Sequence, residues 1–102
     1  NIQTIHYYWE DSAKSYFERF DYYFNKDICV GWNLYCRYST VTFNKFLEYF
    51  NKYYKAIDSE NWYFSETNSD YELDILTASN GKFIMINAFN RNYRDLIILN
   101  LN

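Results

Sequence analysis

Residues 42–56 read TFNKFLEYFNKYYKA, and this stretch decides the fold. Its large apolar side chains recur every three or four residues, which is the spacing of one helical face. That stripe consists of Phe43, Phe46, Leu47, Phe50 and Tyr54. Ser39, Thr40 and Thr42 offer N-caps, and Lys52 and Lys55 suit the negative end of the helix dipole. The stretch therefore predicts one amphipathic helix over about 42–56.

On both sides of this helix the chain reads mainly as strands. Residues 28–38 alternate between a strongly apolar set and a more polar set, and residues 71–75 alternate in the same way. Asn80-Gly81 lies between two apolar runs, and both residues accept positive φ, so the pair predicts a hairpin turn. The further strands are expected over 2–9, 62–66, 83–89 and 96–101.

The segment 15–25 fits two structures. As a helix it places Tyr16, Phe17, Phe20, Tyr23 and Phe24 on one face. As a strand it places every second residue from 20 to 24 on one face. Crowded aromatic side chains favour a strand, followed by a turn at residues 25–27.

Together these elements predict an α+β fold and a single domain over residues 1–102. Strands grouped before and after one helix favour an antiparallel sheet of about six to seven strands with the helix packed on one face. The expected order is β-β-β-α-β-β-β-β. With 102 residues and 49% apolar types, the chain can bury a core without metal or disulfides.

Composition and charge exclude several function classes. A net charge of −3 gives no basic stripe for direct binding to nucleic acid. No apolar run is long enough to span a membrane. The opening residues lack the features of a signal peptide, so we expect a cytoplasmic protein with Cys29 and Cys36 as reduced thiols. The 25% aromatic content is the unusual feature, and it suits both cores and wet interfaces.

The residues do not predict an enzyme. The single histidine, His6, lies near one end and is expected at a surface or sheet edge. Gly31 and Gly81 are the only glycines, which excludes a phosphate-cradling loop, and Gly31 is expected at a strand bend or close contact. The same-face carboxylates Glu72 and Asp74 are expected on a solvated face. We therefore expect no catalytic residues, no cofactor and no metal.

The one charge asymmetry is an acidic segment with interleaved aromatic residues. No Lys or Arg occurs between residues 58 and 74. Acids with aromatics suit a basic partner, since charge steers the encounter and aromatics anchor it. An ordinary solvated face explains the segment equally well. The candidate partner-binding residues are Asp58, Glu60, Trp62, Tyr63, Glu66, Asp70, Tyr71, Glu72 and Asp74.

The order and spacing of elements resemble those of the small bacterial immunity proteins of the WapI-like class. The likeness covers residues 27–102: the 32–38 strand, the Phe43-x-x-Phe46-Leu47-x-x-Phe50 helix, the strands 71–77 and 83–89 around Asn80-Gly81, and 96–101. Such proteins often continue past the last strand with a further helix, whereas this chain ends directly after it. The resemblance implies direct binding to a toxin domain, often a nuclease, whose active site is blocked.

The leading hypothesis is thus an immunity or inhibitor protein of the contact-dependent growth inhibition type, which binds a basic cognate toxin. One alternative is a phage-encoded inhibitor of a host defence nuclease, which needs the same acidic face. Others are a small ligand-binding domain with an aromatic pocket around Trp32 and Tyr35, and a structural subunit. Because the strand edges lack Pro, a weak homodimer that pairs edge to edge is a further alternative.

Overall fold

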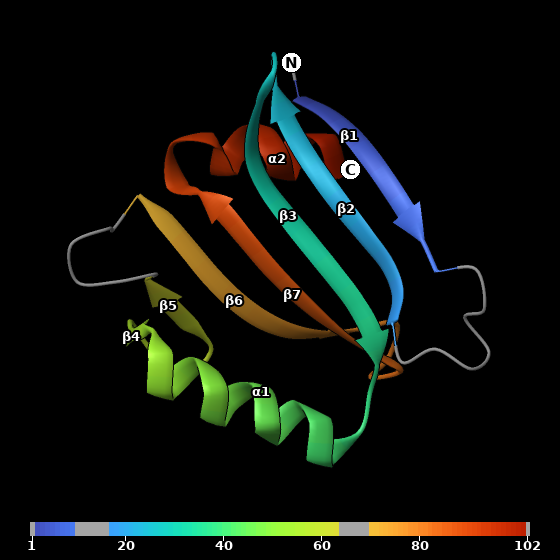
Figure 1. The fold of residues 1–102 in the computed structure, drawn as a ribbon, viewed down its shortest axis with the longest axis vertical. Coiled ribbons are helices and arrows are strands. Elements are labelled where there is room, and N and C mark those ends of the chain that lie inside the picture. The colour runs from blue at the N-terminus through green and yellow to red at the C-terminus, as the bar shows by residue number, and fades with distance from the viewer. Residues whose placement is uncertain (1, 10–16, 64–69, 102) are drawn as a thin grey trace.

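The structure, a computed structural model, describes residues 2–9, 17–63 and 70–101, which form one antiparallel sheet with two helices (Figure 1). In chain order the elements are β1 (Ile2–Tyr8), β2 (Phe17–Asn25), β3 (Ile28–Arg37), α1 (Thr40–Tyr53), β4 (Lys55–Ala56), β5 (Asn61–Tyr63), β6 (Tyr71–Ala78), β7 (Phe83–Asn90), a 3₁₀ turn (Arg91–Tyr93) and α2 (Arg94–Leu101). Within the described residues the sheet has seven strands. The predicted α+β class and the antiparallel sheet with one long helix are confirmed.

The strand order is β1-β2-β3-β7-β6-β5-β4. The first three strands form a meander, and β7 then pairs with β3, with Gly31 opposite Phe89 and Arg37 opposite Phe83. The two-residue β4 and the seven-residue β1 form the two edges. Segment 17–25 is a strand, so the strand alternative is confirmed and the helix alternative is wrong.

Helix α1 begins and ends earlier than its apolar stripe predicts. Ser39 is the N-cap, and its Oγ accepts a hydrogen bond from the Thr42 N–H at 3.1 Å. The helix ends at Tyr53 because Lys55 and Ala56 pair with Tyr63 and Trp62 of β5. The predicted end at residue 56 is therefore wrong, since sheet pairing takes the last two residues.

One face of the sheet packs against α1 and forms the main core. Phe50 of α1 lies against Trp62 with ring centroids 5.2 Å apart, and both side chains are buried. The Trp62 Nε1–H donates to Asn51 Oδ1 at 2.9 Å, which satisfies the buried indole. Ile75 and Ile84 beneath them are fully buried. Dry packing of this kind is the dominant favourable term in folding.

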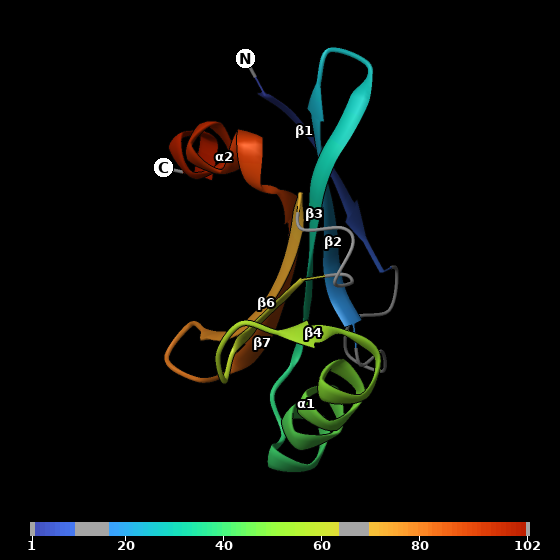
Figure 2. The ribbon, with the colours of Figure 1, turned by 90° about the vertical axis from the view of Figure 1, so that its left-hand side faces the viewer.

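The prediction of a strand over 96–101 is wrong, because residues 94–101 form α2. β7 already has a neighbour on each side, so no pairing position is open next to it. The 3₁₀ turn, begun by the Asn90 side chain accepting from the Asn92 N–H, redirects the chain. α2 then lies over the sheet face opposite to α1 (Figures 1 and 2). There Ile97 joins Ile2, Tyr23, Val30 and Phe89 in a second apolar cluster.

Two turns and one close contact follow the expected chemistry. Asn80 and Gly81, with φ of 59° and 81°, lie in the β6–β7 turn, and Lys26 has φ of 56° in the β2–β3 turn. Gly31 permits close packing, because a Cβ there would lie 2.8 Å from the Ala88 carbonyl oxygen. Neither Cys29 nor the buried Cys36 forms a disulfide.

Candidate functional site

The acidic segment does not form one continuous surface. Asp58, Glu60 and Asp70 are exposed. The Asp58 carboxylate accepts from the Glu60 N–H at 2.9 Å and the Asn61 amide at 2.8 Å. The Glu60 bond is the main cause of the lowered pKa of Asp58, with Asn61 second. Asp58 therefore organises its own turn.

The aromatic and C-terminal members of the segment have other contacts. Trp62 is fully buried in the core and presents no surface to a partner. Glu72 pairs with Arg91 at 2.9 Å, and the same guanidinium lies over the ring of the half-buried Tyr63. Tyr71 is half-buried. Arg91, which lies outside the segment in sequence, thus offsets part of its charge.

Asp74 lies apart from the exposed acids, facing α2. Glu66 lies outside the described residues, as do all residues from 64 to 69. Of the nine candidate residues, the exposed charge therefore comes from Asp58, Glu60 and Asp70 within the described part of the chain.

The register assigns side chains to two chemically different faces, because successive residues of a strand alternate. On the α1 face, Phe20, Leu34, Ile86 and Ile75 lie opposite one another across β2, β3, β7 and β6. The residue adjacent to each of these points to the other face of the sheet, here called the α2 face. Polar side chains occupy the equivalent positions there.

These side chains form a polar row across six strands of the α2 face. From β1 to β5 the row consists of His6, Asp21, Asn33, Asn87, Asp74 and Asn61. His6 Nδ1 lies 2.5 Å from Asp21 Oδ1, and the Asn87 amide donates to Asp74 Oδ1 at 2.7 Å. Asn33 and Asp21 are buried. A buried polar row inside a sheet this small is a candidate site.

Two acceptors of the polar row have no partner within the described residues. Asp21 Oδ2 and Asn33 Oδ1 are both buried and unpaired. The Asn33 amide donates to the Tyr23 hydroxyl at 2.6 Å, so its oxygen is the unsatisfied end. Arg19 Nε approaches Asp21 Oδ1 to 3.1 Å at an angle unsuited to a hydrogen bond, which makes that contact an ion pair only. An unpaired buried acceptor costs about 1–3 kcal/mol.

Burial raises the pKa of two groups here, Asp74 in the row and Tyr23 beside it. Burial is the main cause of the raised pKa of Asp74, and the nearby Glu72 and Glu60 raise it further. The Asn87 hydrogen bond and the charge of Arg94 oppose that rise. Burial also raises the pKa of Tyr23, with the Asp21 charge second. The negative potential around Asp74 favours positively charged groups.

Two cavities open on the α2 face. The larger, about 410 Å³, lies between α2 and strands β6 and β7, and Asp74, Asn87, Asn61 and Arg94 are its polar lining. The smaller, about 250 Å³, is lined in part by Arg19 and Tyr35. Trp32 borders the larger cavity and Tyr35 the smaller. Neither of these two cavities contains both residues of the expected aromatic pocket.

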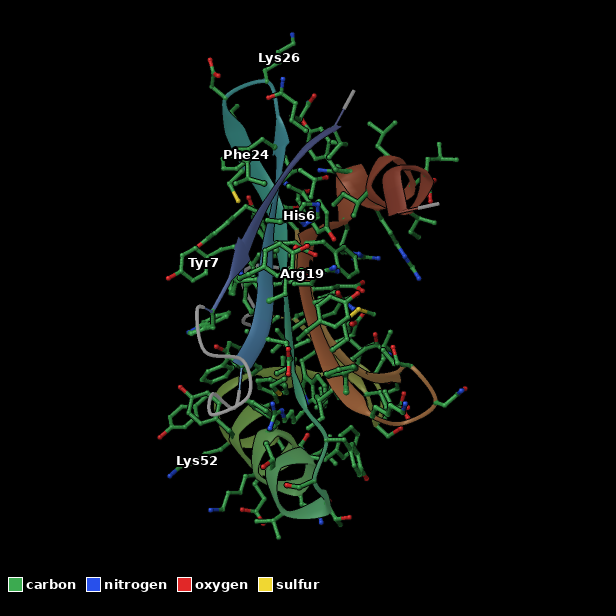
Figure 3. The ribbon with its side chains drawn as sticks, turned by 90° about the vertical axis from the view of Figure 1, so that its right-hand side faces the viewer. His6, Tyr7, Arg19, Phe24, Lys26 and Lys52 are labelled. Atoms are coloured by element: carbon green, nitrogen blue, oxygen red, sulfur yellow. The ribbon has the colours of Figure 1, made fainter. Side chains whose placement is uncertain are left out.

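The part of the α1 face that no described element covers carries a different feature, here called the aromatic platform. It consists of Ile5, Tyr7, Phe20, Tyr22, Phe24 and Trp32. The Phe20 ring stacks on Trp32 at 5.3 Å and contacts Tyr22 at 4.6 Å. Ile5 and Tyr7 are each 56% exposed and Tyr22 is 41% exposed. Figure 3 shows Tyr7 and Phe24 projecting from the side of the sheet away from α2.

Sequence reasoning found part of this and missed the rest. The alternation of Phe20, Tyr22 and Phe24 marked one strand face, but the sequence could not show that α1 leaves this face uncovered. His6 lies on the edge strand β1 with 46% of its side chain exposed, as its place in the sequence predicts, whereas Asp74 is partly buried and not on the predicted solvated face. Only the register brings them into one row, because its members are far apart in the chain.

Within the described residues, no group of three His, Cys, Asp or Glu side chains could hold a metal ion. In the same part of the chain, no helix is long and apolar enough to cross a membrane. No protein-family model matches the chain, and no curated protein or solved structure matches it either.

Proposed function

We propose that this protein is an inhibitor of the immunity type, which binds a cognate toxin domain and blocks its active site by occlusion. The observation that carries the proposal is the aromatic platform. Exposed aromatic clusters are enriched at protein interfaces, where Tyr and Trp supply large contact areas at low entropic cost. The platform also lies on ordered strands, so binding requires little rearrangement.

The acidic residues have a second role in this proposal. Asp58, Glu60 and Asp70 give the chain exposed negative charge, and the net charge is −3. A nuclease toxin must be basic to hold phosphates, so this charge accelerates the encounter without anchoring the complex. The anchors are then Tyr7 and Tyr22 of the platform, in place of the buried Trp62.

The proposal expects a toxin domain to be encoded beside this chain's gene. The test co-expresses that domain with the chain in a growth assay and titrates the two in vitro. The wild-type chain is expected to restore growth and to bind the toxin at a one-to-one ratio. The double variant Tyr7→Ser/Tyr22→Ser is expected to bind at least about tenfold more weakly, since central aromatic residues dominate interface energy.

The matched control is Tyr49→Ser/Tyr53→Ser on α1, whose side chains are 53% and 57% exposed. This control removes the same two groups from a different surface and is expected to protect cells as the wild type does. Equal loss in both double variants, or protection without a complex, would contradict the proposal.

A further inference from the structure

The cavity of about 410 Å³ under α2 has the composition of a small-molecule site. Its volume lies within the range of roughly 300–1,000 Å³ typical of such sites. Apolar side chains from both layers form most of its wall. They are Leu76, Met85, Phe89, Ile97 and Ile98. An apolar body of a ligand would therefore be buried between the sheet and α2.

The polar groups of the cavity are arranged around one carboxylate. Asp74 is held by the Asn87 amide at 2.7 Å, so its position is fixed before any ligand arrives. Glu72 and Glu60 add negative potential at Asp74, whereas Arg94 adds positive potential. Glu72 is itself paired with Arg91. Arg94 is exposed, with its guanidinium 5.9 Å from the Phe89 ring centroid.

The adjacent polar row adds a second, independent observation. Asn33 lies directly opposite Asn87, and its buried Oδ1 has no partner within the described residues. Asp21 Oδ2, one strand further, is also buried and unpaired. Asn33 Oδ1 and Asp21 Oδ2 are hydrogen-bond acceptors, as is the Asp74 carboxylate. Arg19 Nε, an unpaired buried donor, lies on the same face, but neither it nor Asn33 and Asp21 lines the cavity. The preference of the cavity for a ligand that donates therefore rests on the Asp74 carboxylate in its wall.

We propose that this cavity binds a small amphiphilic amine. Its ammonium group donates to Asp74, and its chain or ring lies against Leu76, Met85 and Ile97. The charge-assisted bond from the ammonium to Asp74 fixes the orientation, and the apolar walls supply the contact area. The site is on the face opposite to the aromatic platform, so it stands or fails independently of toxin binding.

Three probes that share a phenethyl group test the ligand class: phenethylamine, 2-phenylethanol and 3-phenylpropionate. They present an ammonium, a neutral hydroxyl and a carboxylate on the same aromatic body. The amine is expected to bind with a Kd of about 1 mM or below, the usual range for a ligand of this size. The alcohol should bind more weakly, and the acid weakest. Preference for the acid would assign the anchor to Arg94 and overturn the proposal, as would equal binding of all three.

Side-chain amide signals in ¹⁵N NMR spectra locate the site in the unaltered protein. The amine is expected to shift the Asn87 and Asn61 amides, which line the cavity. The Asn51 amide, whose oxygen accepts from Trp62 in the α1 core, is the internal reference and is expected to stay unchanged. Shifts confined to residues outside the cavity would overturn the proposal whatever the variants do.

The variant Asp74→Asn keeps the size of the side chain and removes its charge. It is expected to weaken amine binding at least about tenfold and to leave alcohol binding within about twofold, because only the charged bond is lost. Asp70→Asn is the matched control, since Asp70 is an exposed acid that directly precedes β6 and does not line the cavity. Equal amine affinity in the wild type and Asp74→Asn would overturn the proposal.

Discussion

The two faces of the sheet are built from the same strands but have opposite chemistry. On the α1 face, β3 and β7 contribute Leu34 and Ile86 to a dry core. On the α2 face, the next residues of the same strands are Asn33 and Asn87, which belong to the polar row. One face thus supplies most of the stability, and the other holds groups whose hydrogen bonds are incomplete.

This difference separates the face that stabilises the fold from the face that lines the cavities. Apolar side chains on the α1 face lose water on folding and gain contacts with α1. Buried polar side chains on the α2 face give little net stability and lose free energy when unpaired. A row of them next to a cavity is costly for folding alone, so a binding role explains it better than a structural role.

The largest expected effect is on the α1 face. Trp62→Ala removes the largest fully buried side chain and its bond to Asn51. We expect a loss of about 3–5 kcal/mol in the free energy of unfolding, measured by urea denaturation. A loss below about 1 kcal/mol would mean that the core is not concentrated beneath α1, and the contrast between the faces would fail.

A smaller effect is expected where the sheet and α2 approach each other. In Gly31→Ala the new Cβ would lie 2.8 Å from the Ala88 carbonyl oxygen and 3.3 Å from Ile97 Cδ1. We expect a loss of about 1–3 kcal/mol in urea denaturation, because the nearest atom belongs to the backbone. The double variant Gly31→Ala/Ile97→Val should recover little of it. Full recovery would show that α2, and not the sheet backbone, is the obstacle.

The effect of Asp74 on stability is expected to be smaller and to depend on pH. Because burial raises its pKa in the folded state, the folded protein holds this proton more tightly than the unfolded chain does. The stability of the wild type should therefore fall as the pH rises from the usual aspartate pKa of 3.8 through the raised value. Asp74→Asn should lack this component.

The measurement for Asp74 is the difference in unfolding free energy between Asp74→Asn and the wild type from pH 3 to 7. This difference should shift in favour of the variant as the pH rises. A shift in the opposite direction would mean that Arg94 and Asn87 outweigh burial, and that the α2 face holds a stable carboxylate without a ligand.

The smallest effect on stability is expected at the aromatic platform. Tyr7→Ser removes a side chain that is 56% exposed and contacts Trp9 with ring centroids 5.3 Å apart. We expect the free energy of unfolding to change by about 0.5 kcal/mol or less, as at most surface positions. A thermal melt can check this. A large loss would show that the platform is part of the core and is not available to a partner.

The longer strands and the apolar stripe of α1 were predictable because their signal is local, whereas the short β4 was not. Phe43, Phe46 and Phe50 repeat with helical spacing, and residues 28–38 alternate with strand spacing. The α2 segment was not, since Leu96 to Leu99 form a short apolar run that fits either structure. What decides it is the occupied position on both sides of β7, which is a property of the whole sheet.

The polar row and the cavity could not be predicted from local sequence patterns, for the same reason. Nothing near His6 in the sequence indicates that Asp21 lies opposite, and nothing near Asn33 indicates Asn87. Such pairings depend on register across strands that are distant in the chain. The acidic segment was visible as a composition, but the Arg91 contact that offsets Glu72 lies outside it.

The pairing of β3 with β7 has a consequence for how the chain folds. It joins two units that can each form locally: the β1-β2-β3 meander and the β6–β7 hairpin. Bringing Gly31 beside Phe89 closes a loop that contains α1, β4, β5 and β6. Closing so long a loop costs chain entropy before its contacts compensate. The docking of these two units is therefore expected to limit the folding rate.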